Sequence, residues 1–123
     1  MIEPWITQWS YLVYRYIHHE PVDRNIQGWQ LPEGGPLSNA NSALPWIVFS
    51  RDVKRFAVEF PQWQIKETVS HTPFGYLLSG GVSFRSFVPG AFFEACCRFE
   101  KSLALFMPGI AMFATIVLER RGP

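Results

Sequence analysis

Two histidines and a glutamate stand together in the sequence, at His18, His19 and Glu20. Histidine titrates near neutral pH, so one of these side chains could act as a general base or bind a polar group of a substrate. Neighbouring histidines on a helix point about 100° apart, which makes it difficult for both to bind one metal ion. The alternative is that the cluster only stabilises the C-terminus of a helix. We interpret the three residues as candidate catalytic residues and expect no metal.

Four other side chains could shape a substrate site. Asn39 and Asn41 could orient a polar group of a substrate, or they could simply form turns. Tyr14 and Trp46 could line an aromatic pocket, or they could pack in the core, which is the more common role. The sequence contains no Ser-His-Asp order, no pair of CxxC motifs and no phosphate-binding loop.

The composition of the 123-residue chain limits the classes of function. Eleven basic residues against ten acidic ones give a net charge of +1, which offers no general attraction for nucleic acid or anionic lipid. Hydrophobic residues make up 48% and charged residues 17%, which predicts a folded domain. The aromatic content of 16% predicts an apolar core, an apolar pocket or an interface separated from its partner.

Several features indicate a cytoplasmic protein. Cys96 and Cys97 are adjacent, and neighbouring cysteines rarely form a disulfide, so we expect a reducing compartment. The first residues lack the basic and apolar stretches of a signal peptide. Residues 102–118 are uncharged but short for a membrane span, and Pro108 and Gly109 interrupt them. We therefore expect no membrane span.

Apolar residues recur at helical spacing in three segments. Thr7 and Ser50 are suitable N-caps for the first two helices, which we expect to end near residue 18 and at residue 60. The third helix is expected over residues 91–107. The predicted buried faces comprise Ile6, Trp9, Leu12, Val13, Tyr16 and Ile17 in the first helix, Val53, Phe56, Ala57 and Phe60 in the second, and Phe92, Cys96, Phe99, Leu103 and Phe106 in the third.

Three segments have the character of strands. Residues 62–70 alternate, with Trp63, Ile65 and Val69 expected on one covered face, which is typical of a strand at a sheet edge. Residues 110–118 are apolar throughout, which predicts a strand with neighbours on both sides. The first five residues fit the tail of a strand. This α/β alternation with few strands predicts a sheet that lacks its beginning.

The connecting segments are punctuated by glycine and proline. Residues 21–44 are expected to form one long loop, which in a small domain is usually functional or mobile. Residues 44–49 are apolar and are expected to form a short extended piece. Residues 71–90 are expected to form an ordered loop with one helical turn.

Four segments together resemble the C-terminal portion of a bacterial class I S-adenosylmethionine-dependent methyltransferase family. They are Ile-Glu-Pro-Trp-Ile-Thr at 2–7, His-His-Glu-Pro at 18–21, Gly-Pro-Leu-Ser-Asn-Ala-Asn-Ser-Ala-Leu-Pro-Trp-Ile-Val-Phe at 35–49 and Leu-Leu-Ser-Gly-Gly-Val-Ser at 77–83. The resemblance covers essentially the whole chain and depends on the succession of the segments. It implies a single partial domain over 1–123 with three helices and part of a Rossmann-like sheet. Residues 1–3 would end strand five, 62–70 would form strand six, and 110–119 would form an antiparallel strand seven between them.

The resemblance also implies a transferase that uses S-adenosylmethionine and a small-molecule substrate. The family's cofactor site needs a Gly-rich turn after strand one and an acidic residue at the end of strand two. Gly34-Gly35 and Gly80-Gly81 do not follow a strand and open a helix, so the sequence does not supply that turn. We therefore expect the chain alone to bind no cofactor and to be inactive without an N-terminal half.

On the same template, Glu3 would lie at the carboxyl end of a parallel strand. That edge of an open α/β sheet faces the ligand crevice, so Glu3 is a candidate substrate-binding residue. The alternative is a solvated carboxylate in a loop.

A second hypothesis is a small non-enzymatic α/β interaction module. Such a module would pair an exposed sheet edge and an aromatic surface with a second copy or another protein. The fragment hypothesis predicts that the isolated chain self-associates or binds its missing half.

Overall fold

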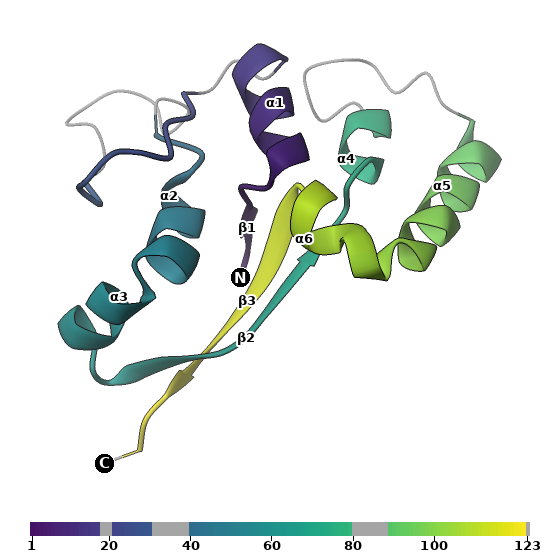
Figure 1. Cartoon of the computed structure of the whole chain (residues 1–123). Coiled ribbons are helices and arrows are strands. Elements are labelled where there is room, and N and C mark those ends of the chain that lie inside the picture. The colour runs from purple at the N-terminus through teal and green to yellow at the C-terminus, as the bar shows by residue number, and fades with distance from the viewer. Residues whose placement is uncertain (18–20, 31–39, 80–88, 123) are drawn as a thin grey trace.

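The computed structural model describes residues 1–17, 21–30, 40–79 and 89–122. These residues form a mixed α/β structure with a small antiparallel sheet (Figure 1). In chain order its elements are β1 (Ile2–Pro4), α1 (Gln8–Tyr16), α2 (Leu44–Trp46), the π-helical segment η2 (Ile47–Arg51), α3 (Val53–Glu59), β2 (Trp63–His71), α4 (Gly75–Leu78), α5 (Gly90–Ser102), the 3₁₀ turn η3 (Ala104–Phe106), α6 (Met107–Ile110) and β3 (Phe113–Arg120).

The three described strands are ordered β1-β3-β2, and β3 is antiparallel to both neighbours. This arrangement confirms that the last apolar segment lies between the first residues of the chain and segment 62–70. The strand begins later than expected, because residues up to Ile110 are helical. Since β1 and β2 run in the same direction, their carboxyl ends meet at one sheet edge, where Pro4 and His71 both pair with Phe113.

The predicted covered face of β2 is wrong. A register shift between Ile65 and Glu67 places an extra residue, Lys66, in the strand. A bulge of this kind moves the following side chains to the opposite face. Ile65 therefore pairs with Leu118 on one face, whereas Val69 pairs with Thr115 on the other and is exposed.

Helix α1 begins as predicted at the N-cap Thr7, whose hydroxyl accepts a hydrogen bond from Ser10 N. Its buried face differs from the prediction, since Leu12, Tyr16 and Ile17 are exposed. The buried residues are Ser10, Val13 and Tyr14. The Tyr14 hydroxyl donates to Met112 O over 2.6 Å, and this buried bond turns that face toward the segment before β3.

The extended piece predicted at 44–49 is helical, and Ser50 lies inside η2 instead of capping a helix. Pro45 is compatible with this conformation because it occupies the first turn of α2, where its missing N–H has no helical partner. Ile47 is completely buried, so the apolar run reaches the core as one side of a helix. Of the predicted buried face of α3, Phe56 alone is buried.

Helix α5 also buries a different face from the one predicted. Phe92, Phe99 and Phe106 are exposed, and Glu100 is the buried residue of α5. The predicted stop at Pro108 and Gly109 is absent, because Pro108 falls in the first turn of α6.

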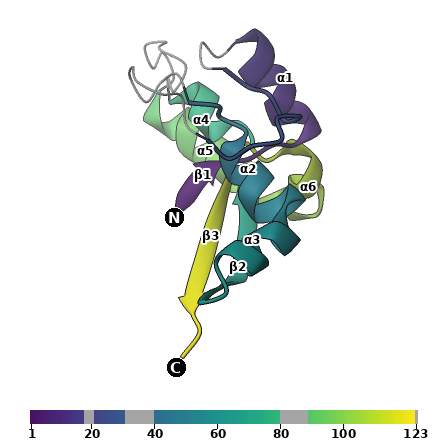
Figure 2. The same cartoon turned by 90° about the vertical axis from the view of Figure 1, so that its left-hand side faces the viewer.

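The main hydrophobic cluster joins α1, η2 and the segment before β3. Its buried members are Ile6, Val13, Tyr14, Ala43, Ile47 and Met112. Figures 1 and 2 show α1 and α4 at the end of the sheet where β1 and β2 terminate. Within the described parts of the chain, no helix has both the length and the apolar character needed to cross a membrane.

Candidate functional site

A pocket of about 350 Å³ lies at the carboxyl end of β2. The volume lies at the lower end of the range for small-molecule sites. We call it the β2-end pocket. Its lining residues come from the end of β2, from α5 and from the helical turns that follow: Ser70, His71, Thr72, Cys97, Glu100, Lys101, Ala104 and Met107.

His71 is held between two hydroxyl groups. Its Nδ1 lies 2.7 Å from Thr72 Oγ1, and its Nε2 lies 3.0 Å from Thr115 Oγ1. Burial lowers the pKa of His71, and the charge of Glu100 opposes this effect. The imidazole is therefore neutral near pH 7, with one nitrogen donating and the other accepting.

Glu100 is a buried carboxylate, with 8% of the residue exposed. Its Oε1 accepts hydrogen bonds from Phe74 N and Gly75 N, each over 2.6 Å. A Cβ at Gly75 would lie 3.4 Å from Glu100 Oε2, which is an ordinary van der Waals contact, so the approach of the carboxylate does not itself require glycine. Trp9 holds the same turn from the other side, because its Nε1 donates to Pro73 O over 3.0 Å.

Thr72 has a φ of 55°, in the left-handed region. For a residue other than glycine this conformation typically costs about 1–3 kcal/mol, and it persists where the surroundings impose it. Here two contacts impose the conformation. Thr72 is hydrogen-bonded to His71, and the turn that follows Thr72 is bonded to Glu100. Strained residues concentrate at functional sites, so Thr72 supports a functional role for the pocket.

The cysteines of α5 have no sign of nucleophilic activation. Burial raises the pKa of Cys96, which keeps it a thiol near neutral pH. Cys97 lines the pocket and is half-buried. Among the described residues, no group of three or more His, Cys, Asp or Glu side chains could hold a metal ion.

The chemistry available in the β2-end pocket is therefore proton transfer and hydrogen bonding. His71 and Thr72 form a hydrogen-bonded pair that can take up a proton, and the charge of Glu100 favours the protonated imidazole.

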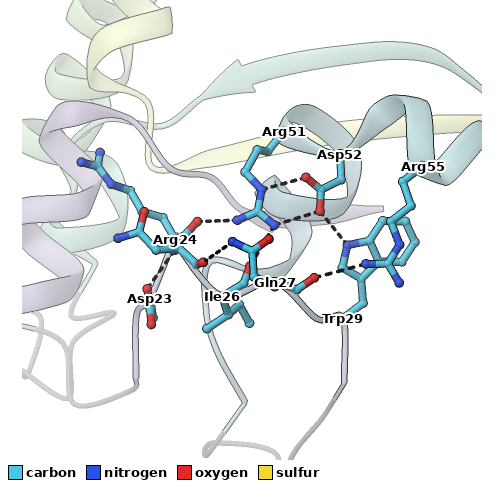
Figure 3. Close-up of polar contacts among 9 residues, drawn as sticks. Asp23, Arg24, Ile26, Gln27, Trp29, Arg51, Asp52 and Arg55 are labelled. Carbon is cyan, nitrogen blue, oxygen red and sulfur yellow. Dashed lines mark hydrogen bonds and ion pairs between the residues drawn. The ribbon is translucent and has the colours of Figure 1, made fainter.

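A larger depression, of about 720 Å³, lies beside α2 and α3. Its lining residues are Arg24, Asn25, Gln27, Trp46, Arg51, Asp52, Lys54 and Arg55. Figure 3 shows the polar contacts of several of them. Four cationic side chains at one place suggest a binding site for an anion. Whether an anion could bind there depends on how far the guanidinium groups are already bonded to the protein itself.

Arg51 is occupied by groups of the protein itself. Its Nε and Nη2 donate to the two carboxylate oxygens of Asp52, over 2.7 and 2.8 Å. Its Nη1 donates to Arg24 O, and its Nη2 donates to Ile26 O. Hydrogen bonds from Arg51, and then from Trp29, lower the pKa of Asp52 to about 2. Arg51 thus attaches the loop of residues 24–29 to η2 (Figure 3).

Arg55 has a similar role. Its guanidinium lies over the Trp29 ring at 4.3 Å, its Nη1 donates to Gln27 O, and its Nε pairs with Glu59 over 2.6 Å. The larger depression is therefore the seat of the loop 24–29, and the β2-end pocket is the better candidate site.

Four of the eight candidate residues predicted from the sequence are described by the structure, and these four are not gathered at the β2-end pocket. His18, His19, Glu20 and Asn39 lie outside the described residues. Tyr14 and Trp46 belong to the same core cluster, and Trp46 also borders the larger depression. Asn41 bonds to the backbone of Asp23, and Glu3 is half-buried opposite Ala114 in the sheet. None of these four described residues lines the β2-end pocket.

Sequence reasoning missed His71, Thr72 and Glu100. A signal existed for His71, because it directly follows the predicted strand 62–70 and so stands at a strand's carboxyl end. No local signal existed for Glu100, which reaches its partners 26 and 25 residues away.

Comparison with known proteins finds no matching family model, no similar curated protein and no similar solved structure. A functional assignment therefore depends on the sheet topology and the β2-end pocket.

Proposed function

We propose that this chain is the substrate-side, C-terminal part of a class I S-adenosylmethionine-dependent methyltransferase and transfers methyl groups only together with a cofactor-binding half. The sheet topology carries the proposal. The resemblance implies that strand seven is inserted antiparallel between strands five and six. The antiparallel pairing of β3 with both β1 and β2 supports this proposal.

The outer edge of β1 supports a missing partner. Among the described strands β1 pairs with β3 alone, and Ile2 is 65% exposed. An apolar strand edge of this kind is usually paired or covered in a stable protein. A strand of the cofactor-binding half would pair with this edge.

Exposed helix faces support the same interpretation. Leu12 and Tyr16 of α1, and Phe92 and Phe99 of α5, are exposed although their spacing is typical of a buried face. Large apolar areas on a monomer usually mark an interface. The rest of a methyltransferase domain would cover part of this surface.

Gly75 is a poor candidate for the glycine of a cofactor-binding turn. Gly75 is a glycine at a turn from a strand to a helix, but its N–H is bound to Glu100 Oε1. It is therefore not free to approach a ribose or a phosphate. In this proposal the cofactor is held by the other half, and this chain supplies the pocket for the methyl acceptor.

The alternative is a non-enzymatic interaction module, which the cluster of exposed side chains at Leu105 and Phe106 favours. Leu105 is 91% exposed and Phe106 is 64% exposed. A module would bind its partner through this surface and would have no use for the proton-accepting pair in the β2-end pocket.

The decisive experiment extends the chain. The coding sequence upstream of Met1 is determined and the extended protein is expressed beside the 123-residue chain. We expect the upstream segment to encode a strand, a Gly-rich turn and a helix. Calorimetry should show one S-adenosylmethionine bound per extended chain and no binding by the shorter chain. An upstream segment without that motif, an extended chain that binds no cofactor, or micromolar binding by the shorter chain would contradict the proposal.

A further inference from the structure

The β2-end pocket has the polarity of a site for a small uncharged molecule. Glu100 and Lys101 carry opposite charges, and the Glu100 carboxylate is already bound to two backbone N–H groups. Ala104 and Met107 supply an apolar wall. An anionic ligand would be placed beside a buried carboxylate, which is unfavourable. A ligand with an apolar body and one polar hydrogen fits these surroundings better.

The hydrogen bonds of His71 determine which atom of the pocket can accept a hydrogen bond from the ligand. A neutral imidazole has one N–H. When it is on Nε2, it donates to Thr115 Oγ1, and Nδ1 accepts from the Thr72 hydroxyl. The lone pairs of Thr72 Oγ1 are then available to accept a hydrogen bond within the pocket that Thr72 lines.

We propose that the β2-end pocket binds a hydroxyl compound with a small apolar body, such as a phenol, and that Thr72 and His71 accept its proton. The ligand O–H donates to Thr72 Oγ1. When that O–H bond breaks, its proton passes to Thr72 Oγ1 as the Thr72 proton passes to His71 Nδ1, leaving an oxyanion and an imidazolium. No further reactant is needed. Burial disfavours the imidazolium, and the Glu100 charge opposes that effect.

The strain at Thr72 is consistent with this role. A glycine would adopt a φ of 55° without cost, yet the position holds a residue with a hydroxyl group. The hydroxyl lies 2.7 Å from His71 Nδ1, and the conformation places it there. A purely structural turn would gain stability from glycine, whereas a proton relay requires the oxygen.

The inference rests on the proposed function, because it names the methyl acceptor as a hydroxyl compound. Its test uses the 123-residue chain and no cofactor, so the two can fail separately. If the chain binds phenol but the extended protein binds no cofactor, only the methyltransferase proposal is contradicted. If the extended protein binds S-adenosylmethionine but no phenol, only this inference is contradicted.

Phenol and anisole are the matched probes, because they share the ring and anisole lacks the hydroxyl hydrogen. Titration is followed by the ¹⁵N chemical shifts of the His71 ring, which also report the tautomer. We expect saturable binding of phenol, an Nε2–H tautomer, and binding of anisole that is weaker by about tenfold. Equal binding of both probes, an Nδ1–H tautomer, or the absence of saturable binding would overturn the inference.

Three variants separate a functional role from a structural one. Thr72→Gly permits the left-handed conformation and removes the hydroxyl, so we expect phenol affinity to fall by about tenfold while the melting temperature stays equal or rises. His71→Phe removes the proton acceptor and should weaken phenol to the level of anisole. Thr68→Ala deletes an exposed hydroxyl on the same strand and should leave phenol binding unchanged. Wild-type phenol affinity in Thr72→Gly would exclude the relay, even if His71→Phe fails to fold.

Discussion

At the scale of single residues, one buried carboxylate organises the candidate site. Glu100 binds the backbone of Phe74 and Gly75, and these bonds fix the turn that holds Thr72 in its strained conformation. Thr72 in turn contacts the ring of His71. The geometry of the proton-accepting pair therefore depends on a residue that comes 28 positions after Thr72 in the chain.

Removing Glu100 should destabilise the protein. Glu100→Ala leaves the N–H groups of Phe74 and Gly75 without their acceptor, and two such losses cost about 2–4 kcal/mol. Glu100→Gln keeps a carbonyl oxygen at the same position and should cost less than half as much. Urea denaturation of both variants measures the difference. Equal losses in the two variants would show that charge, and not the acceptor, is what the turn requires.

His71 should make stability depend on pH. Its pKa in the folded chain is lowered from 6.5, mainly by burial. Below pH 6.5 the unfolded chain takes up a proton that the folded chain does not yet accept, so protonation favours unfolding. Stability is therefore full above pH 6.5 and falls as the pH drops from there toward the lower folded pKa.

The comparison of wild type with His71→Phe isolates this effect. The other two histidines are present in both proteins, so their contributions cancel in the difference. Thermal denaturation of both proteins from pH 8 to pH 5, a range of about one and a half units on either side of the ordinary histidine pKa, measures it. An unchanged pH dependence in the variant would contradict the lowered pKa.

At the scale of elements, a cationic helix face holds a loop. Arg51 of η2 donates to the carbonyls of Arg24 and Ile26, and Arg55 of α3 donates to that of Gln27 (Figure 3). Trp29 completes the contact, since its ring lies under Arg55 and its N–H bonds to Asp52. The loop is thus attached by its backbone carbonyls and by the side chain of Trp29.

Arg51→Gln should release this loop without unfolding the helix. Glutamine cannot reach both carbonyls and both oxygens of Asp52, because it lacks the forked guanidinium. Hydrogen exchange should therefore become faster at residues 24–27 and stay unchanged in β2 and β3. Lys54→Gln, on an exposed neighbour, is the matched control. Wild-type exchange at 24–27 in Arg51→Gln would show that Trp29 alone retains the loop.

At the scale of the whole molecule, much apolar surface has no partner within the described chain. Ile2 exposes the edge of β1, and Leu105 and Phe106 project from the turn after α5. Both the methyltransferase proposal and the interaction-module alternative require such surfaces to be covered by another chain or segment.

We expect the isolated chain to self-associate through these surfaces. Light scattering over a range of protein concentrations should give a mass above that of the 14.2 kDa chain. The double variant Leu105→Ser and Phe106→Ser should reduce the association, because it removes apolar area without touching the sheet or the pocket. A monomer at every concentration would count against a missing partner.

The sequence by itself determined the order of the main helices and strands and the place of the last strand. A continuous apolar run requires neighbours on both sides, and β3 has them. It also located the start of α1, because the cap at Thr7 depends on residues within one helical turn. These features follow from hydrophobic patterns and local hydrogen bonds, which are visible in a short stretch of sequence.

Only the tertiary structure decided which helix faces are buried and where the candidate site lies. The sequence predicts Glu100 as a solvated residue of a helix, but its hydrogen bonds to distant backbone N–H groups accompany its burial, while Phe92 and Phe99 are exposed. The bulge at Lys66 likewise reverses a face that alternation had assigned. The physical reason is that hydrogen bonds between residues far apart in the chain can outweigh local amphipathicity, and no local pattern announces them.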